Sequence, residues 1–361
     1  MWTTCRIEGQ LIAANIIGQE DLILVTGATG FVGYRVVESL LDHGFRNLRC
    51  FARPSSDVAR LESLSRLHVG ARVEVVKGNL LSCEDCTTAT KDVALLFHLA
   101  AGIGLESFPD AYLNSVVTTR NLLEASLQHQ CLRRFVNISS FSVYSNVGKP
   151  RWRLLDESCP VEKRPELRDA YTFAKVKQDE IVTEYSREFG IPYVIVRPGY
   201  VYGPGTDGMD GRIGINLFGV FLHLGGSNKI PFTCVDNCAE AIVLCGLAEG
   251  VDGQVFNVVD DDLPSSRQFL RMYKRNVRTF KSLYVPHAAT YLVCCLWERY
   301  SIWSEGQLPL FLSRKKWHVV WKKTRYSNAK LKMQVGWAPK VPMLEGFKRC
   351  WESSEHGEQH A

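Results

Sequence analysis

Tyr171 and Lys175, within the stretch YTFAK, are the residues whose types and spacing point most directly to chemistry. Residues four positions apart lie on one face of a helix, so this phenol and ammonium can meet a single ligand. Tyrosine ordinarily ionises near pH 10, and bringing its pKa to about 7 requires about 4 kcal/mol of preferential stabilisation of the phenolate. A neighbouring ammonium supplies part of that stabilisation. The pair therefore predicts an acid–base group that exchanges a proton with a hydroxyl or carbonyl oxygen.

A run of hydroxyl side chains, NISSFSVYS, follows a strand-like segment upstream of this pair. A hydroxyl at the carboxyl end of that strand would project into the same crevice as Tyr171. We expect Ser140 to hydrogen-bond the substrate oxygen and hold it against the phenol. Ser139 and Ser142 are the competing choices for this role.

Three glycines spaced G-x-x-G-x-x-G lie in TGATGFVG, directly after an apolar run and before a helical pattern. Gly27 permits the turn, Gly30 lets backbone N–H groups approach a pyrophosphate, and Gly33 lets the helix pack closely on the strand. The order strand, turn and helix predicts a dinucleotide site. The remaining predicted contacts of this turn are Thr29, Phe31 and Val32.

Arg53 occupies the position, about twenty residues past the glycines, where NAD sites favour a carboxylate for the ribose hydroxyls. The nearest carboxylate is Asp57. Because an arginine suits a 2′-phosphate, the sequence favours NADP over NAD as the cofactor. The alternative is an arginine that stacks on adenine whichever cofactor is bound.

Strand-like and helix-like segments alternate over the first two hundred residues. Short apolar runs separated by helical patterns predict parallel strands buried on both faces. Right-handed crossovers then give an α/β fold, a doubly wound Rossmann sheet with a smaller C-terminal substrate lobe. The predicted strands are 22–27, 48–53, 73–78, 94–100, 134–140, 192–198 and 253–259. The predicted divisions are an N-terminal extension (1–20), the Rossmann domain (21–200), a mainly substrate-binding lobe (201–352) and a flexible tail (353–361).

Composition is that of a globular protein, with 46% hydrophobic and 22% charged residues. The twelve cysteines are irregularly spaced, and no second pair completes a zinc site with Cys83 and Cys86, so we expect reduced thiols, no metal and a cytoplasmic location. The apolar stretch 284–297 is too short for a membrane span. We interpret it as a buried helix, with a flap over the substrate pocket or an interfacial helix as alternatives.

Charge is unevenly distributed along the chain. Residues 264–350 hold 18 Lys and Arg against three Glu, a net charge of about +15, whereas the rest is acidic. A basic lobe beside a nucleotide turn indicates an anionic substrate, although a solvated cationic face or an anionic membrane surface would also explain it. No nucleic-acid motif accompanies the charge, so a nucleic acid partner is not expected.

Taken together, several motifs make residues 21–352 resemble an extended short-chain dehydrogenase/reductase of the NAD-dependent epimerase/dehydratase branch. The motifs are TGATGFVG, FHLAA, SSFSVYS, YTFAK, RPGYVYGPG and FTCVDNCAEAIVL. The resemblance implies a Ser–Tyr–Lys site of Ser140, Tyr171 and Lys175, and a homodimer. It also implies cofactor contacts, with Tyr171 and Lys175 themselves and with Asn79, Leu80, Leu99, Ala100, Ala101, Pro198, Gly199 and Val201.

Two departures from the family pattern affect the predicted cofactor site. Asn79 stands where an aspartate is usual, which weakens the adenine contact. The family's N-x-x-G-T motif falls on residues 115–119 without its Asn and Gly, so we assign a cofactor contact to Asn114, one residue earlier. His98 lies within a predicted buried strand and is interpreted as a hydrogen-bonded core residue.

The same Ser–Tyr–Lys set serves more than one reaction. Sugar 4,6-dehydratases that resemble this family carry an Asp–Glu pair where this chain has Phe141 and Ser142, so dehydration is not expected. Epimerisation of a nucleotide sugar, which the basic lobe favours, is the first expectation, and the following reaction is its alternative. A reductase or 3β-hydroxysteroid dehydrogenase-like enzyme acting on an apolar alcohol or ketone is favoured by the apolar stretch 291–303 and by Arg53. A third reading is a nucleotide-sensing regulator without catalysis.

Overall fold

A seven-stranded parallel sheet forms the centre of the protein in the computed structural model, which describes residues 15–102, 107–145, 153–206, 208–217, 219–304 and 312–357. The strand order is β12-β7-β5-β4-β1-β2-β3. This confirms the predicted doubly wound Rossmann fold. The strands are β1 (Ile23–Thr26), β2 (Asn47–Ala52), β3 (Arg72–Lys77), β4 (Leu95–His98), β5 (Arg134–Ile138), β7 (Tyr193–Pro198) and β12 (Gln254–Val258).

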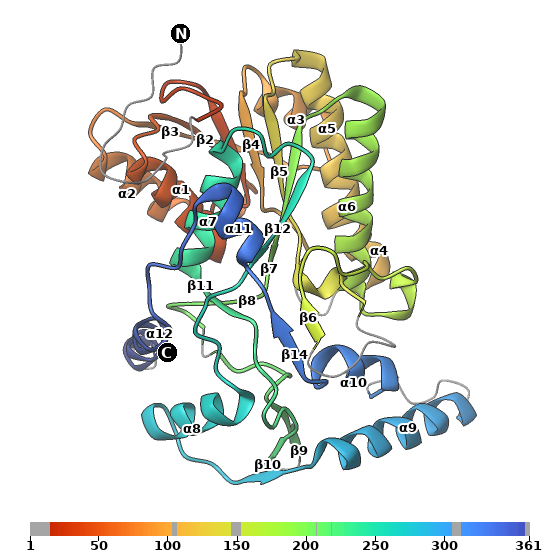
Figure 1. The fold of residues 1–361 in the computed structure, drawn as a ribbon. Helices are drawn as coiled ribbons and strands as arrows, with labels where there is room; N and C mark the ends of the chain where they lie inside the picture. The colour runs from red at the N-terminus through yellow and green to blue at the C-terminus, as the bar shows by residue number, and fades with distance from the viewer. Residues whose placement is uncertain are drawn as a thin grey trace.

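The central strands β1 and β4 are mainly apolar and fully buried because helices cover both faces of the sheet (Figure 1). In β1, Ile23 and Val25 point into one apolar cluster and Leu24 into the other, as alternation along a strand requires. The first face packs against α1 (Phe31–Asp42), α2 (Ala59–Leu67), α7 (Val235–Leu247) and α11 (Ala329–Val335). The second packs against α3 (Cys83–Thr90), α5 (Thr118–His129) and α6 (Ala170–Phe189).

A smaller part lies below the carboxyl ends of these strands and is assembled from segments far apart in the chain (Figure 1). Three small sheets form it, with the orders β13-β10-β9, β11-β8 and β14-β6. Their strands are β6 (Arg153–Leu155), β8 (Tyr200–Tyr202), β9 (Gly214–Leu217), β10 (Val220–His223), β11 (Phe232–Cys234), β13 (Ser282–Tyr284) and β14 (Thr324–Tyr326). The accompanying helices are α8 (Ser266–Asn276), α9 (His287–Trp303) and α10 (Arg314–Val320).

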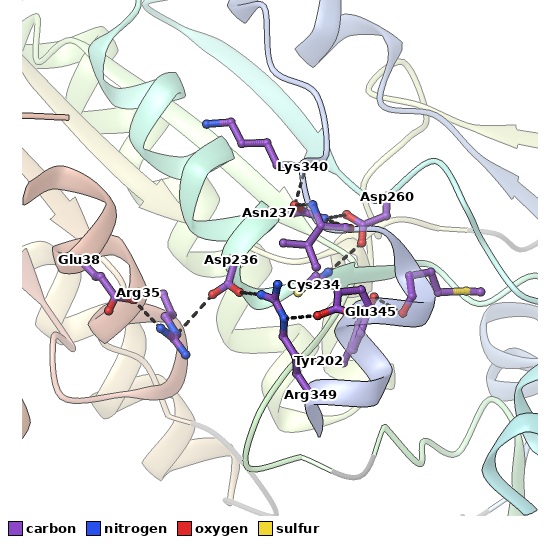
Figure 2. Close-up of polar contacts among 12 residues, drawn as sticks. Arg35, Glu38, Tyr202, Cys234, Asp236, Asn237, Asp260, Lys340, Glu345 and Arg349 are labelled. Carbon is purple, nitrogen blue, oxygen red and sulfur yellow. Dashed lines mark hydrogen bonds and ion pairs between the residues drawn. The ribbon is translucent and has the colours of Figure 1, made fainter. Parts of the chain in front are cut away.

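Asn237, at the start of α7, fastens the returning C-terminal segment to the core (Figure 2). Its side-chain oxygen accepts the backbone N–H groups of Lys340 at 2.9 Å and Val341 at 2.8 Å. Its amide nitrogen donates to the Val341 carbonyl at 2.9 Å and to Asp260 at 3.1 Å. The motif FTCVDNCAEAIVL therefore contains a structural asparagine that holds residues a hundred positions apart.

An ion-pair chain beside this asparagine ties the last helix, α12 (Met343–Gly357), to α1 and α7. Asp236 lies 3.4 Å from Arg35 and 3.3 Å from Arg349, which itself pairs with Glu345 at 3.0 Å (Figure 2). The C-terminal helix is thus anchored on the Rossmann part. It also extends to Gly357, into the segment that we expected to be a flexible tail, and residues 358–361 lie outside the described part of the chain.

The interpretation of residues 284–297 as a buried helix is wrong. The helix α9 exists, but only Thr290, Cys294 and Ser301 of it are buried, while Leu292 and Leu296 are more than half exposed. A run of apolar residues indicates a helix without indicating whether a partner covers both of its sides. No helix in the described ranges is long and apolar enough to cross a membrane.

Candidate active site

Tyr171 and Lys175 lie in the first and second turns of α6. The helix begins at Ala170 because the carboxylate of Asp169 accepts the Thr172 N–H at 2.9 Å and so caps its first turn. Ser140 follows β5 directly and caps a short 3₁₀ turn, accepting the Ser142 N–H at 3.1 Å. The Ser140 hydroxyl lies near enough to the Tyr171 phenol to lower its pKa, and both side chains line the same cavity. The structure therefore brings together the serine and tyrosine that we expected to act on one oxygen.

The three candidate serines have different surroundings. Ser139 is buried, and its hydroxyl donates to Asp179 at 2.9 Å, which is a structural contact. Ser140 and Ser142 both face the larger cavity of the site. The hydroxyl of Ser142 is buried without a hydrogen-bond partner in the structure, so it remains available to a substrate.

Burial raises the pKa of Tyr171, and the nearby Ser140 hydroxyl only partly offsets this effect. The phenol is therefore protonated at neutral pH in the protein alone. A neutral phenol beside a serine hydroxyl is equipped to donate a proton to a carbonyl oxygen.

The ammonium of Lys175 is directed into the protein. It donates to the Ile138 carbonyl at 2.6 Å and to the side-chain oxygen of Gln178 at 2.9 Å. Burial lowers the pKa of Lys175 to about 8, although Asp179 opposes the shift. Lys175 is thus a buried cation between β5 and α6 whose charge is sensitive to mildly alkaline pH.

A buried chain of hydrogen bonds continues from Lys175 towards the glycine turn. Gln178 donates to the Thr119 hydroxyl at 2.9 Å, and His98 bonds Thr119 at 2.9 Å and Thr26 at 2.8 Å. Burial, assisted by the nearby Lys175, lowers the pKa of His98 to about 3. His98 is therefore the neutral, hydrogen-bonded core residue that we expected.

Ser140 and Tyr171 open onto a cavity of about 580 Å³. Apolar and aromatic side chains make up most of its wall, contributed by elements from both parts of the molecule: Phe141, Tyr144, Leu155, Tyr200, Val201, Ile215, Val319, Val320, Trp321 and Tyr326. Phe141 stacks on Tyr326 with ring centroids 5.8 Å apart. The cavity can hold a flat or ring-shaped body against the phenol.

Two arginines reach the same cavity, and each lies near a carboxylate. Arg212 pairs with Asp210 at 3.2 Å. Arg168 lies 3.9 Å from Glu162, a separation too long for a hydrogen bond, and both side chains are less than a tenth exposed. The wall thus contains three cations, Arg168, Arg212 and Lys316, and a carboxylate lies within 4 Å of each of the two arginines.

A second cavity, of about 250 Å³, lies at the carboxyl ends of β1, β2 and β4, where Rossmann folds hold dinucleotides. Ten of the predicted cofactor residues line it: Gly27, Thr29, Gly30, Arg53, Asn79, Leu80, Leu99, Ala100, Ala101 and Asn114. Gly199 and Val201 line the larger cavity instead. Phe31, Val32, Gly33, Lys175 and Pro198 are absent from the walls of both cavities.

The glycine turn fits a pyrophosphate on two grounds. Gly27 has φ of +70°, and a Cβ there would lie 2.8 Å from the Ala100 nitrogen, while a Cβ at Gly33 would overlap the Gly27 carbonyl oxygen. The turn therefore keeps α1 close to β1 only with glycine at both positions. No side chain caps the first turn of α1, so the N–H groups of residues 31–33 remain available to an anion.

Arg53 is exposed at the end of β2 and faces the smaller cavity together with Ser56. The Asn79 side chain is partly engaged, because its oxygen accepts the Leu81 N–H at 3.0 Å. Asn114 reaches the cavity from a π-helical turn over Tyr112–Val117, a wider turn that is frequent at functional sites.

Comparison with known protein families matches residues 23–258 to the NAD dependent epimerase/dehydratase family. The chain belongs to this family. A UDP-glucose epimerase of Bacillus subtilis, itself uncharacterized, is 32% identical over 190 residues, which cover 50% of this chain and 57% of that protein. The chain thus matches little more than half the length of that relative.

Other relatives are named for different activities. A 3β-hydroxysteroid dehydrogenase of Mycolicibacterium neoaurum is 28% identical over 264 residues, covering 69% of this chain and 68% of that protein. A 3β-hydroxysteroid-dehydrogenase/decarboxylase of Arabidopsis thaliana is 24% identical over 373 residues, covering 93% and 80%. The fold also matches a UDP-glucuronic acid 4-epimerase of Bacillus cereus with NAD, at a TM-score of 0.69 and 20% identity, covering 93% of this chain and 99% of that structure.

Several residues of the site were not identified from the sequence. Gln178 and Thr119, which connect Lys175 to His98, are 59 residues apart, and no local pattern links them. Arg168 and Trp321 enter the substrate cavity from a loop and from the end of α10. Of these residues, only Arg168 could have been suspected from the sequence, because it lies three residues before Tyr171.

Proposed function

We propose that this epimerase/dehydratase-family protein is an NADP-preferring oxidoreductase that interconverts a carbonyl group and an alcohol on a compound with an apolar ring body. The observation that carries this proposal is the wall of the larger cavity. It is mainly aromatic and aliphatic, and each of its two arginines has a carboxylate, Asp210 or Glu162, within 4 Å.

In the reducing direction, the bound cofactor would supply a hydride to the carbonyl carbon. Tyr171 gives its phenol proton to the carbonyl oxygen, and Ser140 donates a hydrogen bond that holds this oxygen in place. The product is the alcohol, with one hydride and one proton added. The residues that would hold the cofactor are the glycine turn at its pyrophosphate and Arg53 and Ser56 at its adenosine ribose. The family resemblance assigns the nicotinamide ribose to Lys175, whose ammonium would have to turn from Ile138 and Gln178 to reach it.

A nucleotide sugar is the second candidate substrate. The net charge of about +15 over residues 264–350 favours a pyrophosphate, and Arg168, which is not hydrogen-bonded to Glu162, could take one of its oxygens. The same Ser140 and Tyr171 would then serve epimerisation through a keto intermediate that stays in the site.

The test is a substrate comparison with purified protein and both reduced cofactors. We expect apolar cyclic ketones, such as 3-ketosteroids, to consume NADPH stoichiometrically, which is followed by the absorbance of the reduced cofactor. UDP- and dTDP-sugars are the comparison set, with products separated by chromatography. Conversion of a nucleotide sugar without net loss of reduced cofactor, and no turnover of any ketone, would replace this proposal with epimerisation.

A further inference from the structure

The outward face of α9 is apolar. Leu292, Val293, Leu296, Tyr300 and Trp303 recur at helical spacing on it, and Trp303 is 77% exposed. A continuous stripe of this kind on a protein surface marks a site of contact with another apolar phase.

The inward face of α9 connects this stripe to the substrate cavity through one layer of side chains. Tyr291 packs edge-on against Trp317 of α10 with ring centroids 5.0 Å apart, and His287 also contacts Trp317. The residues of α10 that follow, Val319 and Val320, line the cavity itself. Whatever covers α9 therefore lies next to the substrate-side wall.

A stripe of arginines lies on the neighbouring helix. Arg267, Arg271 and Arg275 of α8 are spaced four apart, Arg278 follows just after the end of the helix, and all four are exposed. None of them forms an ion pair with an acidic residue in the described ranges. Figure 1 shows α8, β13 and α9 in succession along the lower edge of the molecule, away from the seven-stranded sheet.

We propose that this α8–α9 edge binds peripherally to an anionic lipid bilayer. Aliphatic side chains with Tyr300 and Trp303 suit the boundary between acyl chains and headgroups, and the α8 arginines suit anionic headgroups. A second copy of the chain is a poorer occupant, because a symmetric contact would bring its own α8 arginines towards these. A helix lying in the interface needs no membrane span.

Docking there gives the apolar cavity a source of substrate, and this consequence rests on the function proposed above. Cavity and bilayer would be separated only by α9 and α10, so an apolar ketone dissolved in the membrane could enter without crossing water. The docking itself does not depend on which substrate is turned over.

The experiment is co-flotation of the full-length protein with phosphatidylcholine vesicles, with and without about a third phosphatidylserine. We expect binding to the anionic vesicles that weakens as salt is raised. The double substitution Leu292→Glu and Leu296→Glu should abolish it. Arg271→Gln with Arg275→Gln should weaken it by about 25-fold, since each cation near the surface contributes about fivefold.

Leu67→Glu with Val69→Glu is the matched control, because these residues are 74% and 98% exposed on the Rossmann part. This control should bind vesicles like the unaltered chain. So should Tyr171→Phe, which separates failure of docking from failure of the proposed reaction. The proposal is overturned if the unaltered chain stays with the lipid-free fraction, if the control loses binding equally, or if Leu292→Glu with Leu296→Glu dissociates an oligomer in light scattering without changing flotation.

Discussion

Tyr171 and Lys175 come from consecutive turns of α6 but face different surroundings. The phenol meets Ser140 at the cavity, whereas the ammonium is held inside by Ile138 and Gln178. The i, i+4 spacing predicted that the two would share a helix face, and the residue types predicted proton transfer. The contacts that orient Lys175 come from other elements, and helix periodicity carries no information about them.

Replacing Tyr171 with Phe should lower kcat by about a thousandfold, because the group that gives the proton to the carbonyl oxygen is removed. Cofactor affinity should change little, since the phenol is not part of the smaller cavity. Single-turnover kinetics with a ketone substrate, together with cofactor titration, measure both. Survival of cellular function in this variant would instead support the reading of the protein as a nucleotide-sensing regulator.

Cofactor affinity should depend on pH through Lys175. Because burial lowers the pKa of Lys175 to about 8, its ammonium is present below that pH and is lost as the pH rises through it. We expect the Kd for NADPH to be constant from pH 6 to 7 and to rise above about pH 8. Isothermal titration at several pH values measures this. Lys175→Met should bind weakly with a flat profile, and a step near pH 6.5 in either protein would contradict the assignment of His98 as permanently neutral.

Arg53→Gln should weaken NADP binding by about 10- to 100-fold and NAD binding by less than threefold. The reason is that a charge-assisted hydrogen bond to the 2′-phosphate contributes about 1.5–3 kcal/mol, and NAD lacks this group. Thermal shift with each cofactor at equal concentration compares the two affinities. Equal losses for both cofactors would indicate that Arg53 stacks on adenine instead.

At the scale of elements, the parallel strands were predictable because the central ones are buried on both faces and so appear as short, mainly apolar runs. The short strands of the smaller part were not predicted as sheets. β6 pairs with β14 across about 170 residues, and three-residue strands have no periodicity of their own. The helix α9 was predicted, but the prediction that it is buried was wrong, since hydrophobicity alone does not say what covers a helix.

Asn237→Ala should lower the free energy of unfolding by about 3 kcal/mol. It removes four buried or partly buried hydrogen bonds and leaves the backbone groups of Lys340 and Val341 without their partner, while Asp260 keeps Thr233 and Cys234. Chemical denaturation measures the change. Lys340→Ala is the control, because its exposed ion pair with Glu240 contributes less than about 1 kcal/mol. A similar loss in both variants would mean that the backbone bonds at 340–341 do not depend on Asn237.

At the scale of the whole molecule, the basic and the acidic residues lie in different parts of the structure. The basic segment 264–350 supplies α8, α9 and α10, which form the lower edge in Figure 1, while the acidic remainder forms most of the Rossmann part. The sequence predicted this asymmetry and left three partners open for it: a substrate, a membrane and solvent. Arg168 and Arg212 in the cavity wall each lie within 4 Å of a carboxylate, whereas the α8 arginines form no ion pair within the described ranges, so this part of the positive charge is displayed on the surface.

The family resemblance also predicts a homodimer. Static light scattering of the purified chain should give twice the mass of 40.7 kDa at micromolar concentration. The Leu292→Glu, Leu296→Glu variant should remain dimeric, because the α9 face is assigned to lipid. A monomeric mass for the unaltered chain would contradict this prediction.

The hydrogen bonds of Asn237 and the pairing of β6 with β14 have a consequence for recombination between homologues. The walls of the large cavity come from at least three separated stretches of chain, around residues 140–172, 199–231 and 312–326, interleaved with strands and helices of the main sheet. A chimaera with a single crossover would therefore join half of one pocket to half of another. To transfer the substrate preference of one homologue to another, all three stretches must be exchanged together. Asp236 and α12, which form an ion pair, must then come from the same homologue.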